Sequence, residues 1–159
     1  MDTEFPVCPL CDGQLHPWRK CLRIRRRADG ETDWLQIQIL RCDKCQRSHR
    51  QLPDCLLPYK HYDAMSIEMG IQDGMTAAVA ADTATIYRWQ HWFVAWSVYV
   101  QGVFVALQQR GVAIAAMEPS PPLPPILRVL GRWVGDAPGW LARAVVPVVQ
   151  SGYWQCCPG

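Results

Sequence analysis

Two pairs of cysteines, each spaced C-x-x-C, constrain this chain more than any other feature of its sequence. The first pair is Cys8 and Cys11, and the second is Cys42 and Cys45. Two residues between thiolates allow one tight turn to aim both sulfurs at a single ion, about 2.3 Å away. Because four thiolates complete a tetrahedral shell, these cysteines predict a structural Zn²⁺ site with no open coordination position.

The segment between the two pairs predicts a β-hairpin. Residues 15–27 form a basic, mixed stretch, residues 28–30 are a turn signal, and residues 34–41 alternate apolar and polar side chains. That alternation is the period of a half-buried strand. A hairpin would return the chain so that the second pair meets the first. We therefore expect residues 1–60 to form a zinc ribbon with its connector.

Other uses of the cysteines stay open, namely a rubredoxin-like iron site, disulfides, or no common site at all. The N-terminus is acidic and has no apolar signal region, so a cytoplasmic location is expected, where metal sites are commoner than disulfides. His49 could replace one thiolate, although four thiolates already fill the shell. Cys21 and Cys55 resemble ordinary strand residues, and the adjacent Cys156 and Cys157 are given no role.

Basic residues gather in the expected first strand, although the net charge of the whole chain is only +2. A basic cluster beside a metal site is suited to contact nucleic-acid phosphates. A solvated hairpin edge, where charges discourage aggregation, explains the same residues equally well. The cluster contains Arg19, Lys20, Arg23, Arg25, Arg26 and Arg27. The predicted phosphate contacts are Arg23, Arg25, Arg26 and Arg27.

A proline-rich segment divides the remaining chain. Residues 61–118 are rich in Ala, Gln, Met and Trp and are expected to be helical. Residues 119–159 begin with a run of prolines that favours an extended linker. Short helices are expected after it, at 126–134 and 140–149, the second interrupted by Pro147. The predicted fold is thus small α+β, with an N-terminal four-cysteine ribbon followed by an all-α region.

A helix-turn-helix pattern lies within the helical part. Residues 75–80 predict a short helix, residues 81–83 a turn, and residues 84–93 a second helix with Asp82 or Thr83 as its N-cap. The apolar positions expected to pack the two helices together are Met75, Val79, Ile86, Trp89 and Phe93. A recognition helix reads DNA from its N-terminal end. The contacts predicted there are Thr83, Tyr87, Arg88 and His91.

Three stretches of the sequence carry a further signal. They are residues 41–62, which include the second cysteine pair, His49 and Leu52-Pro53; Thr85-Ile86-x-x-Trp89; and residues 149–154. Together they resemble a family of uncharacterised bacterial proteins that is associated with mobile elements and is similar to the N-terminal regions of transposases. The resemblance covers residues 7–93 best. It implies metal ligation by the four paired cysteines and DNA contact by the helix after Asp82.

Residues 92–107 carry no charge. The stretch is shorter than the roughly 20 residues that cross a bilayer, so no membrane span is expected. A helix that is apolar all round is buried in a core or against a partner chain. One stripe contains Trp89, Phe93, Trp96, Val100, Phe104 and Leu107, and another side carries Val94, Val98 and Val105. The C-terminal helices or a second subunit must cover this surface, and a homodimer through residues 92–107 would do so.

The sequence gives little support to catalysis. Its acidic residues are scattered, and it contains no Gly-rich phosphate loop, nucleophile elbow or H-E-x-x-H motif. We therefore expect a DNA-binding protein without catalysis of its own, a transposon-associated accessory or regulatory factor with a recombinase or transposase as partner. One alternative is a zinc-stabilised protein-interaction module that binds no nucleic acid. Another is an electron-transfer iron protein.

Overall fold

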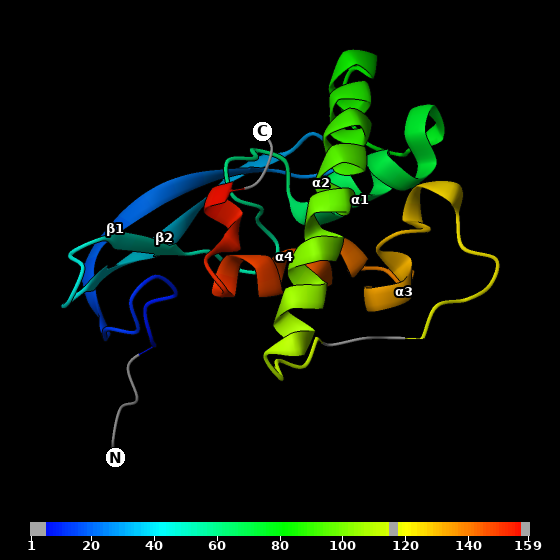
Figure 1. Cartoon of the computed structure of the whole chain (residues 1–159). Coiled ribbons are helices and arrows are strands. Elements are labelled where there is room, and N and C mark those ends of the chain that lie inside the picture. The colour runs from blue at the N-terminus through cyan, green and yellow to red at the C-terminus, as the bar shows by residue number, and fades with distance from the viewer. Residues whose placement is uncertain (1–5, 115–117, 157–159) are drawn as a thin grey trace.

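The computed structural model describes residues 6–114 and 118–156, and in Figure 1 a three-stranded antiparallel sheet lies beside a group of helices. The predicted small α+β class is confirmed. The sheet has the order β1-β2-β3. Its strands are β1 (Leu15–Arg26), β2 (Thr32–Cys42) and β3 (Ser48–Gln51). The α-helices are α1 (Ala64–Asp73), α2 (Thr83–Gln109), α3 (Gly131–Val134) and α4 (Trp140–Gln150). The 3₁₀ helices are η1 (Gly74–Thr76), η2 (Pro125–Leu127) and η3 (Tyr153–Cys156).

The predicted hairpin is confirmed as β1 and β2. Its register runs from Leu15 opposite Cys42 to Arg26 opposite Thr32, with an irregularity near Pro17. The turn depends on Gly30, whose φ of 87° lies in the left-handed region that favours glycine. β3 adds a third strand that the sequence did not predict, and it pairs with the cysteine-bearing end of β2. This arrangement brings the two ends of the hairpin segment together at the cysteines.

The helices share a hydrophobic core centred on α2. The predicted apolar stripe from Trp89 to Leu107 is buried there, against α1, α4 and the segment that contains α3. Phe93 packs edge-on against Trp140 of α4, with ring centroids 5.2 Å apart. The C-terminal helices therefore cover one side of α2, which is one of the two alternatives that the sequence left open.

The first helix predicted for the helix-turn-helix, at residues 75–80, is wrong. The chain there forms only the single turn η1 and then an irregular loop up to Asp82. Met75, expected to be buried, is 59% exposed. In this loop, the backbone of Ala80 bonds to distant segments instead of to a helix. Its amide donates to the Ala28 carbonyl at 2.7 Å, and its carbonyl accepts from the Tyr62 hydroxyl at 3.2 Å. The α-helix that precedes α2 is instead α1, and nine residues separate the two helices.

The second predicted helix of the pattern is confirmed as the start of α2. Asp82 is its N-cap, and its carboxylate accepts a hydrogen bond from the Thr85 amide at 2.6 Å. Ile86, Trp89 and Phe93 are buried, as predicted. The helix runs on without a break to Gln109, so the second helix and the uncharged stretch of residues 92–107 form one element.

Two expectations for the C-terminal third are corrected. The helix expected at 126–134 is reduced to η2 and the short α3. Pro147 does not interrupt α4, which continues to Gln150. Burial of one face of α4, including Leu141 and Val148, offsets the roughly 3 kcal/mol that a proline costs inside a helix. The proline-rich segment has no helix or strand before Pro125.

In the described parts of the chain, no helix is both long enough and apolar enough to cross a membrane. Of the terminal cysteines, Cys156 ends η3, and Cys157 lies outside the described residues.

Candidate metal centre and basic surface

The four paired cysteines meet at one end of the sheet. Cys8 and Cys11 come from the loop before β1, Cys42 ends β2, and Cys45 lies in the loop before β3. Their four sulfurs all lie within 4.8 Å of one another. The Cys8–Cys45 distance is 3.8 Å and the Cys11–Cys42 distance is 3.4 Å. Two sulfurs bound tetrahedrally at about 2.3 Å from one metal are about 3.8 Å apart, so the set fits a single tetrahedral ion.

The two C-x-x-C loops have the same backbone design. In the first, the Cys8 amide donates to the Gly13 carbonyl at 2.8 Å, and in the second the Cys42 amide donates to the Arg47 carbonyl at 2.9 Å. Each amide thus bonds five residues ahead. The residue directly after each pair, Asp12 or Gln46, has a φ near +60°. Two matched loops that face each other are the geometry that a four-thiolate site requires.

The surroundings of Cys42 favour a thiolate. Burial raises the pKa of this thiol, but the backbone amides of Cys45 and Lys44, together with the thiols of Cys11 and Cys45, outweigh burial and lower the pKa to about 7. The Cys45 amide lies 3.4 Å from the Cys42 sulfur. Amide donors that converge on a sulfur stabilise its negative charge, which is the form that binds metal.

His49 lies beside the cluster. Its Nε2 is 3.4 Å from the Cys8 sulfur. Burial, followed by the charge of Arg47, lowers the pKa of the imidazole, so the ring is neutral at pH 7. Cys21 and Cys55 lie outside the cluster, and among the cysteines whose side chains the structure describes, none forms a disulfide.

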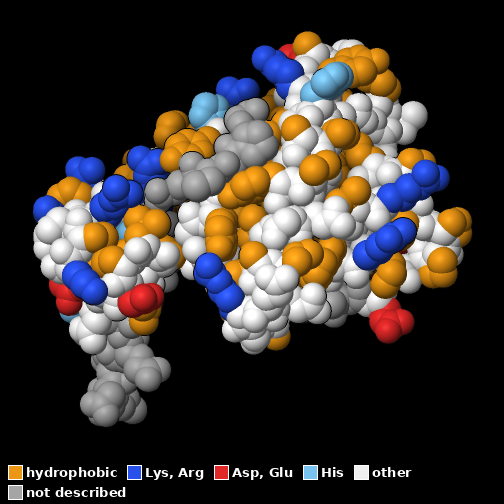
Figure 2. Space-filling model, viewed as in Figure 1, with side chains coloured by type: hydrophobic (Ala, Val, Ile, Leu, Met, Phe, Trp, Pro, Cys, Tyr) orange, Lys and Arg blue, Asp and Glu red, His pale blue; other side chains and the backbone are white. Residues whose placement is uncertain are grey.

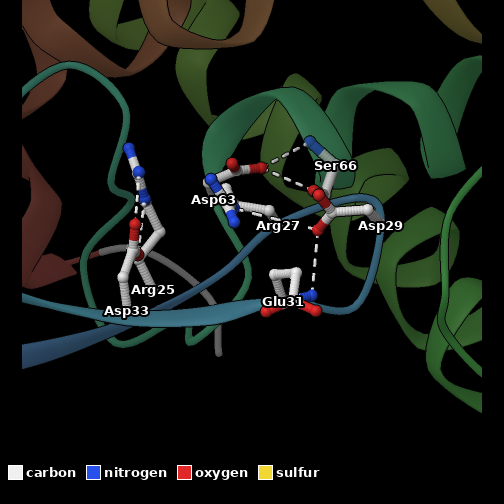
Figure 3. A network of polar contacts seen from close by, with 7 residues as sticks. All are labelled: Arg25, Arg27, Asp29, Glu31, Asp33, Asp63 and Ser66. Carbon is white, nitrogen blue, oxygen red and sulfur yellow. Dashed lines mark hydrogen bonds and ion pairs between the residues drawn. The ribbon is translucent and has the colours of Figure 1, made fainter.

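Two of the four predicted phosphate contacts, Arg23 and Arg25 of β1, make side-chain hydrogen bonds to other parts of the chain. The Arg23 guanidinium donates to the carbonyls of Leu57 and Lys60, and burial lowers its pKa. The Arg25 guanidinium donates hydrogen bonds to both carboxylate oxygens of Asp33, at 2.9 and 2.6 Å (Figure 3). Both side chains thus hold the covered side of the sheet together.

Arg26 and Arg27 lie at the tip of the hairpin and are exposed. Arg27 is 3.8 Å from Asp29 in the turn, an ion pair drawn in Figure 3. Arg26 makes no ion pair with a described residue; its guanidinium lies 5.8 Å from the centre of the Tyr62 ring. The same ring packs edge-on against Trp89 of α2, with centroids 4.9 Å apart.

The hairpin tip and the first turns of α2 lie side by side. The hydrogen bond from the Ala80 amide to the Ala28 carbonyl joins the tip to the loop, two residues before the N-cap Asp82. All four predicted DNA contacts of α2 are exposed there. They are Thr83, Tyr87, Arg88 and His91, and the Arg88 guanidinium donates to the Thr85 hydroxyl at 2.8 Å. The structure therefore brings Arg26 and Arg27 close to the residues predicted on α2.

The sheet also carries two exposed tryptophans for which the sequence predicted no role at the site. Trp18 lies at the irregularity in β1, with the guanidinium groups of Arg19 and Arg41 at 4.5 and 5.0 Å from its ring centre. Trp34 of β2 is 62% exposed. The alternation of residues 34–41 was a usable signal, because it places Trp34 on the side of the strand opposite Leu35 and Ile37.

One side of α2 remains uncovered by the described residues. Val94, Val98 and Val105 are exposed, Val98 by 64%. No charged residue occurs between Arg88 and Arg110, and Figure 2 shows orange and white side chains along the middle of the molecule, where Figure 1 places α2. This uncovered side is the surface where the sequence predicted that a second subunit could pack.

A model of the domain of unknown function DUF6431 matches residues 8–89. The matched segment contains all four paired cysteines, the whole sheet, α1 and the first turns of α2. No curated protein and no solved structure matches the chain.

Proposed function

Because the chain belongs to the DUF6431 family, whose description assigns no activity, we propose a function from the geometry: a zinc-ribbon protein that binds duplex DNA. The proposal has two parts, the identity of the metal and the use of the basic surface. The juxtaposition of the hairpin tip with the N-terminal turns of α2 carries it.

We assign zinc to this donor set. Four thiolates around a tetrahedral position select Zn²⁺ or iron, and neither ribbon loop leaves a position for a substrate. In this role the ion holds the two C-x-x-C loops together and so fixes the end of the hairpin. His49, whose ring is neutral, would donate a hydrogen bond to the Cys8 thiolate rather than replace it.

The proposed DNA surface combines two elements. The positive end of the α2 dipole and the exposed Arg88 face the solvent at the same end of the molecule as Arg26 and Arg27. A helix that presents its N-terminal turns to a groove needs flanking cations to fix its register on the phosphates. α2 would serve as the recognition helix, with Thr83, Tyr87 and His91 toward the groove.

This unit differs from a compact helix-turn-helix, since a nine-residue segment separates α1 from α2. In the proposal the hairpin tip braces that segment, through the Ala80 to Ala28 hydrogen bond. The protein would contribute binding and no catalytic step. Its setting would be a mobile element, as an accessory or regulatory factor for a recombinase or transposase.

Titration of a labelled duplex over a salt series tests the proposal. We expect binding at low salt that weakens steeply between about 50 and 200 mM salt. Replacing both Arg26 and Arg88 with Gln should lower the affinity and reduce the slope of log K against log salt by about 0.9 for each lost phosphate contact. Arg128→Gln, which removes one exposed charge from the C-terminal third, is the matched control and should leave the slope unchanged. Absence of binding at low salt would refute the proposal.

A protein-interaction module is the second candidate, favoured by the uncovered side of α2. An exposed helix face that carries Val94, Val98 and Val105 without a charge is suited to pack against another helix, including α2 of a second copy. Light scattering over a concentration series distinguishes this case. Self-association that Val98→Glu abolishes, without duplex binding at low salt, would favour the module over the DNA-binding protein.

A further inference from the structure

We propose that the open face of the sheet binds an unpaired nucleic-acid strand. The open face is defined by alternate residues of the strands, which point to the same side because side chains alternate along a strand. From the register of β1, β2 and β3, its members are Lys20, Leu22, Ile24, Arg26, Thr32, Trp34, Gln36, Gln38 and Gln51.

The two sides of the sheet differ in how far other segments of the chain cover them. On the opposite side, Ile37 is buried, Arg23 is tied to the connector carbonyls and Arg25 to Asp33. On the open face, Leu22 and Trp34 are 65% and 62% exposed. Because Trp34 pairs with Ile24, which lies two residues from Leu22 on the same side of β1, these apolar side chains form a contiguous patch on the solvent side.

The charge of the open face selects the kind of partner. It carries Lys20 and Arg26 at its two ends, several amides between them, and no acidic residue. The one acidic residue within the paired part of β2, Asp33, lies on the opposite side and is paired with Arg25. A solvated face ordinarily mixes charges of both signs, so a face with only positive charge around an exposed indole complements a polyanion that also offers flat rings.

An unpaired strand has that chemistry. Proteins that bind single strands combine a basic groove along the backbone with aromatic side chains on which bases stack. From Lys20 to Arg26 the face is about 20 Å long at about 3.3 Å per residue. Trp34 lies between these cations and would stack a base, while the exposed amide of Gln36 would contact base edges or the sugar. A duplex offers its bases only as groove edges, so it cannot stack on Trp34.

This inference does not depend on duplex binding by α2, because the two surfaces share only Arg26. The probe is an oligothymidylate of about 12 nucleotides, within the range of known single-strand site sizes. Binding is measured on the full chain with zinc bound. Trp34→Ala should weaken it about tenfold, in line with the loss of one stacked base, while Trp34→Phe should retain most of the affinity.

Tyr59→Ala is the matched control. It removes an exposed aromatic ring from the connector that Arg23 holds on the opposite side of the sheet, and it should leave oligothymidylate binding unchanged. Binding of the same duplex as above should be unaffected by Trp34→Ala. The inference is overturned if the wild-type chain has no affinity for oligothymidylate at low salt, which would leave the open face to a protein partner, or if Trp34→Ala binds as well as wild type.

Discussion

Gly13 shows how closely the cysteine cluster depends on single residues. It is buried two residues after Cys11, and a Cβ there would lie 2.7 Å from the Cys42 sulfur and 2.7 Å from the Lys44 Cβ. Contacts this short cannot occur without displacing one of the loops. The absence of a side chain at position 13 therefore allows the two C-x-x-C loops to approach each other.

Gly13→Ala should weaken metal retention by roughly tenfold, since overpacking at a tightly packed site costs about 1–3 kcal/mol. Competition with a chromogenic chelator measures the change. Gly102→Ala is the control, because a Cβ at position 102 meets nothing within 4 Å. It should stabilise α2 by about 0.5–1 kcal/mol and leave metal retention unaltered. Equal retention in Gly13→Ala and wild type would show that the loops do not depend on this contact.

At the scale of single residues, the sequence predicted the metal cluster better than the basic surface. The C-x-x-C spacing specifies a local turn, so the ligands Cys8 and Cys42 could be identified without knowing the fold. The partners of Arg23 and Arg25 could not, because one is a carbonyl of a distant connector and the other lies across the hairpin. A run of arginines predicts charge, but the register decides which guanidinium groups face the solvent.

Among the elements, α1 and α4 are joined by a buried carboxylate. Glu68 of α1 accepts hydrogen bonds from the amides of Gly139 and Leu141, at 2.8 and 2.9 Å, at the start of α4. Gly139 has no side chain to cap the helix. Glu68 thus supplies from another helix the acceptor that an N-cap residue ordinarily provides.

This contact predicts a pH dependence. Burial raises the pKa of Glu68 above its ordinary 4.5, against the opposing effect of the Leu141 and Gly139 amides. A raised acid pKa means that the folded chain holds the proton more tightly, so the stability from this group is present below pH 4.5 and is lost as the pH rises through the raised value. The free energy of unfolding of wild type minus that of Glu68→Gln should therefore fall above pH 4.5, by about 1.4 kcal/mol for each unit of pKa shift.

Chemical denaturation of the two proteins over a pH series checks this, with Asp73→Asn, an exposed carboxylate at the end of α1, as the control for lost charge. A difference that instead rises with pH would mean that the amides of α4 stabilise the carboxylate more than burial penalises it.

Elements were predictable where the pattern was local. The alternation of residues 34–41 predicted β2, and Asp82 predicted the start of α2. Residues 75–80, rich in alanine, predicted a helix that does not form, because Ala80 bonds to Ala28 and Tyr62 instead. β3 was missed since its four residues are polar and are defined only by pairing with β2.

At the scale of the whole molecule, most buried hydrophobic side chains among the described residues fall into two separate clusters. The helical core is large and centred on α2, whereas the cluster at the cysteines contains only four buried residues. Those four are Cys8, Leu15, Leu40 and Cys42. So small a cluster cannot order the loops by burial alone, and a metal bound as proposed would supply the remaining stability.

Metal removal should therefore affect one part of the molecule before the other. After treatment with a chelator, amide hydrogens at the cysteine end of β1 and β2 should exchange faster, while those of α2 and α4 keep their protection. Hydrogen exchange followed by mass spectrometry on the full chain locates the change. Loss of protection in α2 to the same degree would show that the two cores unfold as one unit.

The most direct test of the account is the coordination shell of the bound metal. X-ray absorption at the zinc edge of the purified full chain should show one zinc per chain with four sulfur neighbours at about 2.3 Å and no nitrogen. A shell of three sulfurs and one nitrogen would give His49 a ligand role in place of a cysteine. A chain that retains no metal would contradict the four-cysteine centre on which the ribbon depends.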